Sequence, residues 1–123
     1  MRIVVADDEP DIRRLVAFAL RRRGYEVAEA AAGDAALDLV RTEVPDLVVL
    51  DVMMPGMNGT EVARALGEDE RTAGIPVLLL SARDQAAEIE EGMTSGARAY
   101  MAKPFAPPEL AERVASLLTA STR

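Results

Sequence analysis

Acidic, hydroxyl and amino side chains follow short apolar runs at several points along this chain. Two aspartates follow the first run, one aspartate follows the third, a serine follows the fourth and a lysine follows the fifth. If these runs are the strands of an open parallel sheet, their carboxyl ends share one edge, which is where such sheets bind ligands. We therefore expect these polar side chains to form one site. The residues are Asp7, Asp8, Asp51, Ser81 and Lys103.

Three carboxylates at one sheet edge repel one another, so a proton or a cation must offset their charge. Oxygen-only ligands favour a hard cation, and Mg²⁺ with retained waters suits a half-open carboxylate cluster. A Mg²⁺ ion beside a carboxylate supports phosphoryl transfer, because that chemistry depends on positioning and charge neutralisation. Asp51 follows the strand predicted to be most buried, so we interpret it as the nucleophile. Ser81 and Lys103 would each contact one phosphoryl oxygen.

Lys103 supports this interpretation independently, because it is the only lysine in the chain and every other basic residue is an arginine. A compact ammonium group reaches a phosphoryl oxygen as a point charge, whereas the planar fork of an arginine demands a different geometry. The position that keeps a lysine is also the one that faces the predicted acidic cluster.

Five strand-like runs must position these side chains. The third and fourth runs are almost wholly apolar, as is typical of strands that are covered on both faces in a parallel sheet. The predicted strands are Arg2–Ala6, Glu26–Ala30, Leu47–Leu50, Val77–Leu80 and Ala99–Ala102.

Segments of helical period lie between and after these runs. Pro10 and Gly24 flank the first helix, and Asn58 with Glu61 has the spacing of a capping box at the start of the third. The fourth helix, between Asp84 and Ser95, has a thin apolar face and is predicted to be the least anchored. Five successive βα units predict a doubly wound α/β sheet with right-handed crossovers.

Strand order decides whether the polar residues meet. With the order 2-1-3-4-5, the first, third and fourth strands are neighbours at a spacing of about 4.8 Å. Asp8, Asp51 and Ser81 would then converge on one pocket. Lys103 would lie one strand further out, within reach of its long side chain.

Length and composition limit the possible functions. A chain of 123 residues suits one domain, residues 1–123, and its formal net charge of −7 argues against direct nucleic-acid binding. The chain has no cysteine and no histidine, which excludes disulfides, histidine metal sites and a Ser-His-Asp triad. No signal peptide and no run long enough to span a membrane is evident, so a cytoplasmic location is expected.

The motifs together resemble, from end to end, the receiver domain of the bacterial two-component response regulators. The resemblance implies a flavodoxin-like fold with the strand order 2-1-3-4-5. It also implies a signalling domain that catalyses only its own phosphorylation and dephosphorylation. The matching segments are Val5–Pro10, Asp46–Gly59, Leu80–Ala82, Gly96–Ala97 and Tyr100–Phe105.

Roles for the site residues follow from this resemblance. Asp51 would accept a phosphoryl group from a sensor histidine kinase or a phosphotransfer protein. Asp8 and Asp51 would bind Mg²⁺ directly together with the backbone carbonyl of Met53, while Asp7 would act largely through a metal-bound water. Lys103 would pair with the phosphoryl group, and the Lys103–Pro104 peptide bond is expected to be cis.

The resemblance also implies a conformational switch. Ser81 would turn toward the phosphoryl oxygen, and Tyr100 would rotate into the space that Ser81 vacates. The fourth helix, fifth strand and fifth helix would then change the face that they present. The output is an unknown partner or a C-terminal effector domain that this sequence does not contain.

Each of these residues also has an ordinary structural interpretation. A lone Asp51 would be a solvated surface acid, Ser81 could cap the helix that follows it, and Tyr100 could be a half-buried ring. Met53, together with Met54 and Met57, could serve local packing. The combination of motifs favours the functional interpretation.

Two other functions compete with the receiver. A Mg²⁺-dependent phosphohydrolase resembling the haloacid dehalogenases would carry a second aspartate at the position of Met53. A flavodoxin-like electron carrier would need a phosphate-binding loop after the first strand, where Asp7, Asp8 and Glu9 would repel a phosphate.

The segment Tyr100–Phe105 also resembles the winged-helix branch of DNA-binding regulators. Those proteins usually dimerise through acids just before the tyrosine, which pair with basic residues on the last helix. Here the positions that are acidic in those proteins hold Arg98 and Ala99. The basic residue of the last helix is still present as Arg113. We therefore predict that the chain does not form that dimer by the usual charge pairing.

Overall fold

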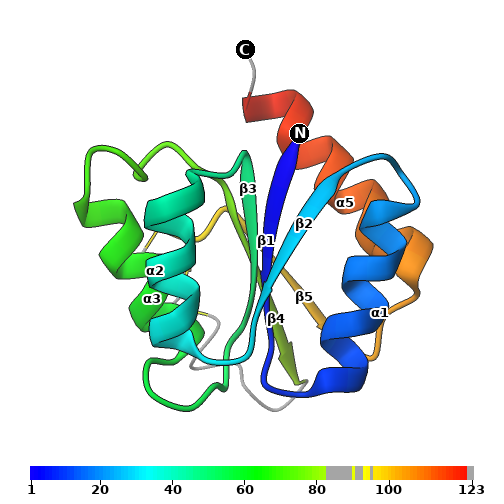
Figure 1. Ribbon diagram of the computed structural model, residues 1–123, viewed down its shortest axis with the longest axis horizontal. Coiled ribbons are helices and arrows are strands. Elements are labelled where there is room, and N and C mark those ends of the chain that lie inside the picture. The colour runs from blue at the N-terminus through cyan, green and yellow to red at the C-terminus, as the bar shows by residue number, and fades with distance from the viewer. Residues whose placement is uncertain (83–89, 91–92, 95, 122–123) are drawn as a thin grey trace.

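Five parallel strands form one sheet in the computed structural model, which describes residues 1–82, 90, 93–94 and 96–121 (Figure 1). The strand order is β2-β1-β3-β4-β5, which confirms the predicted order. The strands are β1 (Arg2–Ala6), β2 (Glu26–Ala30), β3 (Leu47–Asp51), β4 (Val77–Ala82) and β5 (Ala99–Lys103). The helices with assigned bounds are α1 (Pro10–Arg21), α2 (Gly33–Glu43), α3 (Gly59–Glu68) and α5 (Pro107–Ser121).

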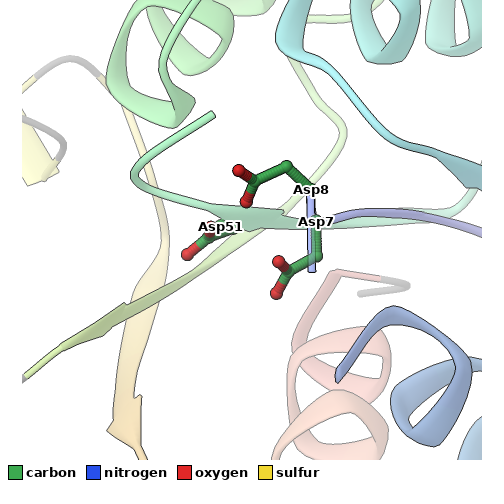
Figure 2. Close-up of side chains that lie close together, drawn as sticks. All are labelled: Asp7, Asp8 and Asp51. Atoms are coloured by element: carbon green, nitrogen blue, oxygen red, sulfur yellow. The ribbon is translucent and has the colours of Figure 1, made fainter. Parts of the chain in front are cut away.

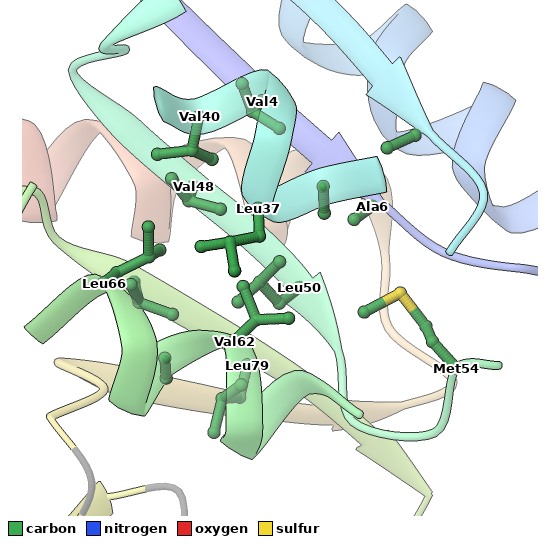
Figure 3. Packing of buried hydrophobic residues seen from close by; sticks show 14 of the residues in the cluster. Val4, Ala6, Leu37, Val40, Val48, Leu50, Met54, Val62, Leu66 and Leu79 are labelled. Carbon is green, nitrogen blue, oxygen red and sulfur yellow. The ribbon is translucent and has the colours of Figure 1, made fainter. Parts of the chain in front are cut away.

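Helices cover both faces of the sheet, with α2 and α3 on one side and α1 and α5 on the other (Figure 1). Successive residues of a strand point to opposite faces. In β1, Val4 and Ala6 pack into the cluster under α2 and α3 (Figure 3). Ile3 and Val5 pack under α1 and α5. The continuous apolar runs of the sequence are thus explained by burial on both faces.

Three strands extend further than the sequence predicted. The first two match the prediction, but β3 ends at Asp51, β4 at Ala82 and β5 at Lys103. Strand pairing continues through the polar residues, with Asp51 opposite Leu80 and Lys103 opposite Ala82. The polar side chains that were expected to follow the strands are therefore held within the sheet itself.

The ends of the helices follow the sequence signals. Pro10 is the first residue of α1, and Gly24 adopts a left-handed φ of 90° after its end. At α3 the Asn58 side chain accepts a hydrogen bond from the Glu61 amide at 2.9 Å, and the Glu61 side chain accepts one from the Asn58 amide at 3.0 Å. The predicted capping box is therefore present.

The helix predicted over residues 84–95 lies mostly outside the described residues, which include only 90, 93 and 94 of that segment. Among the helices that the structure describes, none combines the length and apolar character that crossing a bilayer requires.

Replacing Asn58 with alanine should lower the free energy of unfolding by about 1 kcal/mol, because the first turn of α3 loses its cap. Urea unfolding should show a lower midpoint at an unchanged m-value. The matched variant Glu61→Gln retains an acceptor for the Asn58 amide and should stay near the wild type. Equal stability of Asn58→Ala and the wild type would contradict a stabilising cap.

Candidate functional site

Three aspartates meet at the carboxyl ends of two neighbouring strands. Asp7 and Asp8 follow β1, and Asp51 ends β3, which pairs with β1. One carboxylate oxygen from each aspartate lies within 4.8 Å of the others (Figure 2). Asp7 and Asp51 are buried, whereas Asp8 is exposed. The cluster therefore has two buried carboxylates and one that faces solvent.

The ammonium group of Lys103 reaches this cluster from the end of β5. Its Nζ lies 3.0 Å from Asp7 Oδ2 and 3.2 Å from Asp51 Oδ1. It also lies 3.3 Å from Glu9 Oε1, a contact that the sequence reasoning did not anticipate. Lys103 therefore bridges the two buried carboxylates across β4. The Lys103–Pro104 peptide bond is cis, as the resemblance implied.

The charges of the cluster are only partly balanced. Burial, followed by the charge of Asp7, raises the pKa of Asp51 to about 6, although Lys103 acts in the opposite direction. Burial disfavours the charged form of Lys103, but its hydrogen bond to Asp7 and the charges of Asp51 and Asp7 give a net rise in its pKa. One ammonium group thus faces more negative charge than it can offset.

The turn after β1 is held by hydrogen bonds around Asp7. Its Oδ1 accepts a hydrogen bond from the Glu9 amide at 2.9 Å, and its backbone carbonyl accepts one from Arg13 Nη1 at 3.0 Å. Arg13 also forms an ion pair with Glu29 at 3.3 Å. Asp7 is therefore fixed in place, and the neighbouring Asp8 is the carboxylate with access to solvent.

Ser81 is a fully buried residue of β4, the strand between β3 and β5. Asp51 pairs with Leu80, so Ser81 lies one residue beyond that pair, toward the carboxyl edge of the sheet. Its hydroxyl has no hydrogen-bond partner among the described residues. A buried hydroxyl left unpaired costs about 1–3 kcal/mol, so such a group needs an explanation. The helix that Ser81 could cap in the alternative interpretation lies mostly outside the described residues.

Two other predicted residues lie at the surface. Met53 lies two residues after Asp51 in the β3–α3 loop (residues 52–58) and is 52% exposed. Tyr100, on β5, is 46% exposed and lines a groove that also includes Arg98 and Arg113. The Met53 side chain does not serve core packing, whereas its neighbour Met54 is buried in the core.

A positioning glycine, whose role the sequence reasoning did not identify, lies beside Asp51. A Cβ at Gly59 would overlap the Asp51 carbonyl oxygen and lie 3.1 Å from the Val52 Cα atom. The Gly59 amide donates a hydrogen bond to the Val52 carbonyl at 2.8 Å. The start of α3 therefore packs directly on the backbone of the predicted nucleophile, and only glycine fits there.

The donors at this site fit a hard divalent cation. They are carboxylate oxygens, they carry excess negative charge, and one of them is open to solvent. The Lys103 ammonium group and the Ser81 hydroxyl, which has no partner in the described part of the chain, lie at the same sheet edge, and both are donors that can bind phosphoryl oxygens. The site can therefore support attack by a carboxylate on phosphorus next to a cation.

Comparisons with known proteins agree on one family. The family model described as the response regulator receiver domain matches residues 3–115. The DNA-binding response regulator MtrA of Mycolicibacterium smegmatis is 42% identical over 117 residues, covering 95% of this chain and 50% of MtrA. The alkaline phosphatase synthesis transcriptional regulatory protein PhoP of Bacillus subtilis is 42% identical over 120 residues, covering 98% of this chain and 49% of PhoP. The chain spans about half the length of these relatives.

Solved structures show the same likeness. The chemotaxis protein CheY4 of Vibrio cholerae has a TM-score of 0.87 at 31% identity, covering 94% of this chain and 96% of that one. The receiver domain of the Francisella response regulator 1452 has a TM-score of 0.87 at 32% identity, and 98% of each chain is covered.

Asp51→Asn should raise the stability of the metal-free protein at neutral pH. The folded state holds the Asp51 proton up to about pH 6, whereas a free carboxyl of pKa 3.8 has already released it. The folded wild type therefore binds more protons than the unfolded chain, and its stability falls as the pH rises from about 4 to about 6. The asparagine variant lacks this fall.

Unfolding in urea with excess chelator at several pH values measures this effect. The variant should be more stable by on the order of 2 kcal/mol at pH 7, and the difference should shrink below about pH 4. A difference that does not vary with pH would show that Asp51 ionises normally in the folded state.

Proposed function

The chain belongs to the response regulator receiver family, and from this premise we propose that residues 1–123 form one receiver domain with Asp51 as the phosphoacceptor. Receiver domains are signalling domains of two-component systems, and their family role is to be phosphorylated by a histidine kinase. The observation that carries the assignment of Asp51 is its place in the sheet. It is the buried carboxylate at the end of the central strand, within reach of both Lys103 and two further acids.

Asp8, Asp51 and the backbone carbonyl of Met53 are the proposed direct ligands of Mg²⁺, and Asp7 acts through a bound water. When bound, Mg²⁺ supplies charge neutralisation for the carboxylates and for the entering phosphoryl group. An oxygen of Asp51 forms a bond to phosphorus while the bond from phosphorus to the imidazole nitrogen of the donor histidine breaks. The imidazole leaves with the electron pair of that bond.

Lys103 and Ser81 are the proposed contacts of the transferred group. The Lys103 ammonium already lies beside Asp51, so a small movement would bring it to a phosphoryl oxygen. The Ser81 hydroxyl has no partner to give up among the described residues, so turning toward the phosphoryl group would gain a hydrogen bond. We propose that Tyr100 then rotates inward and alters the face formed by β5 and the helices next to it.

A phosphohydrolase is the weaker candidate. Such an enzyme would need a second carboxylate two residues after the nucleophile, and that position is Met53. Stoichiometric labelling distinguishes the two functions, because a receiver holds one acid-labile phosphoryl group whereas a hydrolase releases phosphate continuously.

We propose that the response to phosphorylation is produced by a partner or a domain other than this receiver. MtrA is a DNA-binding response regulator, and this chain corresponds to about half of its length. We propose a cytoplasmic receiver that is phosphorylated by a sensor histidine kinase or a phosphotransfer protein. It would act on a separate partner or on an effector domain that follows it. A net charge of −7 argues against direct DNA contact by the receiver itself.

Asp51→Asn should abolish phosphorylation, because an amide is a far poorer nucleophile than a carboxylate. Incubation with acetyl phosphate and Mg²⁺, followed by mass spectrometry, should show one adduct on the wild type and none on the variant. Asp38→Asn, on the exposed face of α2, is the matched control and should be labelled normally. Chelation of Mg²⁺ or Asp8→Ala should slow labelling strongly. A full adduct on Asp51→Asn would overturn the assignment.

The two positions just before Tyr100, in the groove beside β5, do not carry the acids on which the dimer implied by the resemblance relies, although Glu109 of α5 also lines this groove. Arg98, Tyr100 and Arg113 line it, and the position just before the tyrosine is the small, buried Ala99. An arginine on α5 without an acidic partner on β5 cannot form the usual charge pair.

We therefore predict that activation with beryllofluoride does not produce a tight dimer through this pairing. Sedimentation should report a monomer with and without beryllofluoride, and Arg113→Ala should leave the result unchanged. An activation-dependent dimer that Arg113→Ala disrupts would contradict the prediction.

A further inference from the structure

The start of α2 lies against the β3–α3 loop, which carries Met53. The Gly33 amide, at the first residue of α2, donates a hydrogen bond to the Pro55 carbonyl at 3.2 Å. A Cβ at Gly33 would overlap the Met57 carbonyl oxygen and lie 2.6 Å from its carbonyl carbon. Because these are backbone atoms, no side-chain rotation relieves the overlap. Gly33 is required here for space.

The β3–α3 loop cannot move far without displacing residues beside the carboxylate cluster. It begins directly after Asp51, and its first residue, Val52, is buried and bonded through its amide to the Leu80 carbonyl at 2.9 Å. Met54 points from the loop into the core (Figure 3). Residue 53 lies between these two anchors, and Pro55 directly follows Met54, so a displacement of residues 55–57 that shifts Met54 also shifts the backbone of residue 53.

The helix on the other side of the contact is held more firmly than the loop. Ala36, Leu37 and Val40 of α2 are buried in the core cluster shared with α3. Moving α2 outward would open that close-packed cluster. By contrast, Pro55 and Gly56 are exposed, and Met57 is only partly buried against the same cluster. An added methyl group at residue 33 would therefore displace the loop before it displaces the helix.

We propose that Gly33 is a positioning residue for phosphorylation, which seats the β3–α3 loop so that the Met53 backbone borders the carboxylate cluster. This inference rests on the proposed function of that cluster. Gly33 touches neither the phosphoryl group nor the cation, and acts through the backbone of residues 55–57. A displacement of about 1 Å at a reacting geometry can cost about a hundredfold in rate, so even a small shift of the loop matters.

The variant Gly33→Ala tests this role against Gly74→Ala, whose added methyl group would meet no atom within 4 Å. We expect Gly33→Ala to bind Mg²⁺ several-fold more weakly in calorimetry. Its labelling by acetyl phosphate at saturating Mg²⁺ should slow by about tenfold to a hundredfold. The Gly59 amide, which closes the loop on Val52, should exchange its hydrogen faster. Gly74→Ala should match the wild type in all three measurements.

A purely structural role would lower the unfolding temperature of Gly33→Ala but leave its Mg²⁺ affinity and labelling rate unchanged when it is folded. That result would overturn the inference. Failure of the wild type and Gly74→Ala to become labelled would instead refute the proposed function, while the Mg²⁺ titration would still test the role of Gly33.

A measurement on the wild type keeps the inference testable if Gly33→Ala does not fold. Because the Gly33 amide is bonded to the loop, Mg²⁺ binding should increase its protection from hydrogen exchange by several-fold. Unchanged protection of Gly33 on Mg²⁺ binding would refute the coupling between the start of α2 and the site.

Discussion

The central physical feature of this protein is an excess of buried negative charge at the carboxyl edge of its sheet. Asp7 and Asp51 are buried side by side, Asp8 lies next to them, and one lysine ammonium lies between the two buried acids. The ammonium does not offset all of this charge, and burial with the neighbouring acids raises the pKa of Asp51 to about 6. A cation would relieve the repulsion between these carboxylates. Its binding would therefore offset part of the free-energy cost of burying them.

The sheet is what holds such an arrangement together. Pairing between strands continues through Asp51, so this acid cannot swing away from its neighbours as a loop residue could. Apolar clusters on both faces of β3 keep water away from the strand that carries it. On the open side, Gly59 and Gly33 allow backbone segments to approach more closely than any side chain would permit. The rigidity of the site thus comes from close packing around it.

Strand β5 connects this site with the surface of the molecule. Its last residue, Lys103, lies against the buried acids, while Tyr100 on the same strand lines an exposed groove with Arg98 and Arg113. The neighbouring strand β4 holds Ser81, a buried hydroxyl with no partner among the described residues. A phosphoryl group would offer hydrogen-bond partners to both Lys103 and Ser81. Movement of either residue would shift β5, because Lys103 belongs to β5 and Ser81 pairs with Ala102 on it. This is the physical basis for expecting a change at the site to reach the groove.

The sequence by itself determined the features that depend on local pattern. Apolar runs placed the five strands, Pro10 and the Asn58–Glu61 pair placed two helix starts, and the polar residues after the runs identified the candidate site. The strand order, by contrast, came from the resemblance to a family. Tertiary structure alone decided the contact of Lys103 with Glu9, the lack of a hydrogen-bond partner for the Ser81 hydroxyl among the described residues, and the fit of Gly33 against Met57. Asp7 and Lys103 are 96 residues apart in the chain, and the pKa of a buried acid depends on every neighbour that such long-range packing brings to it.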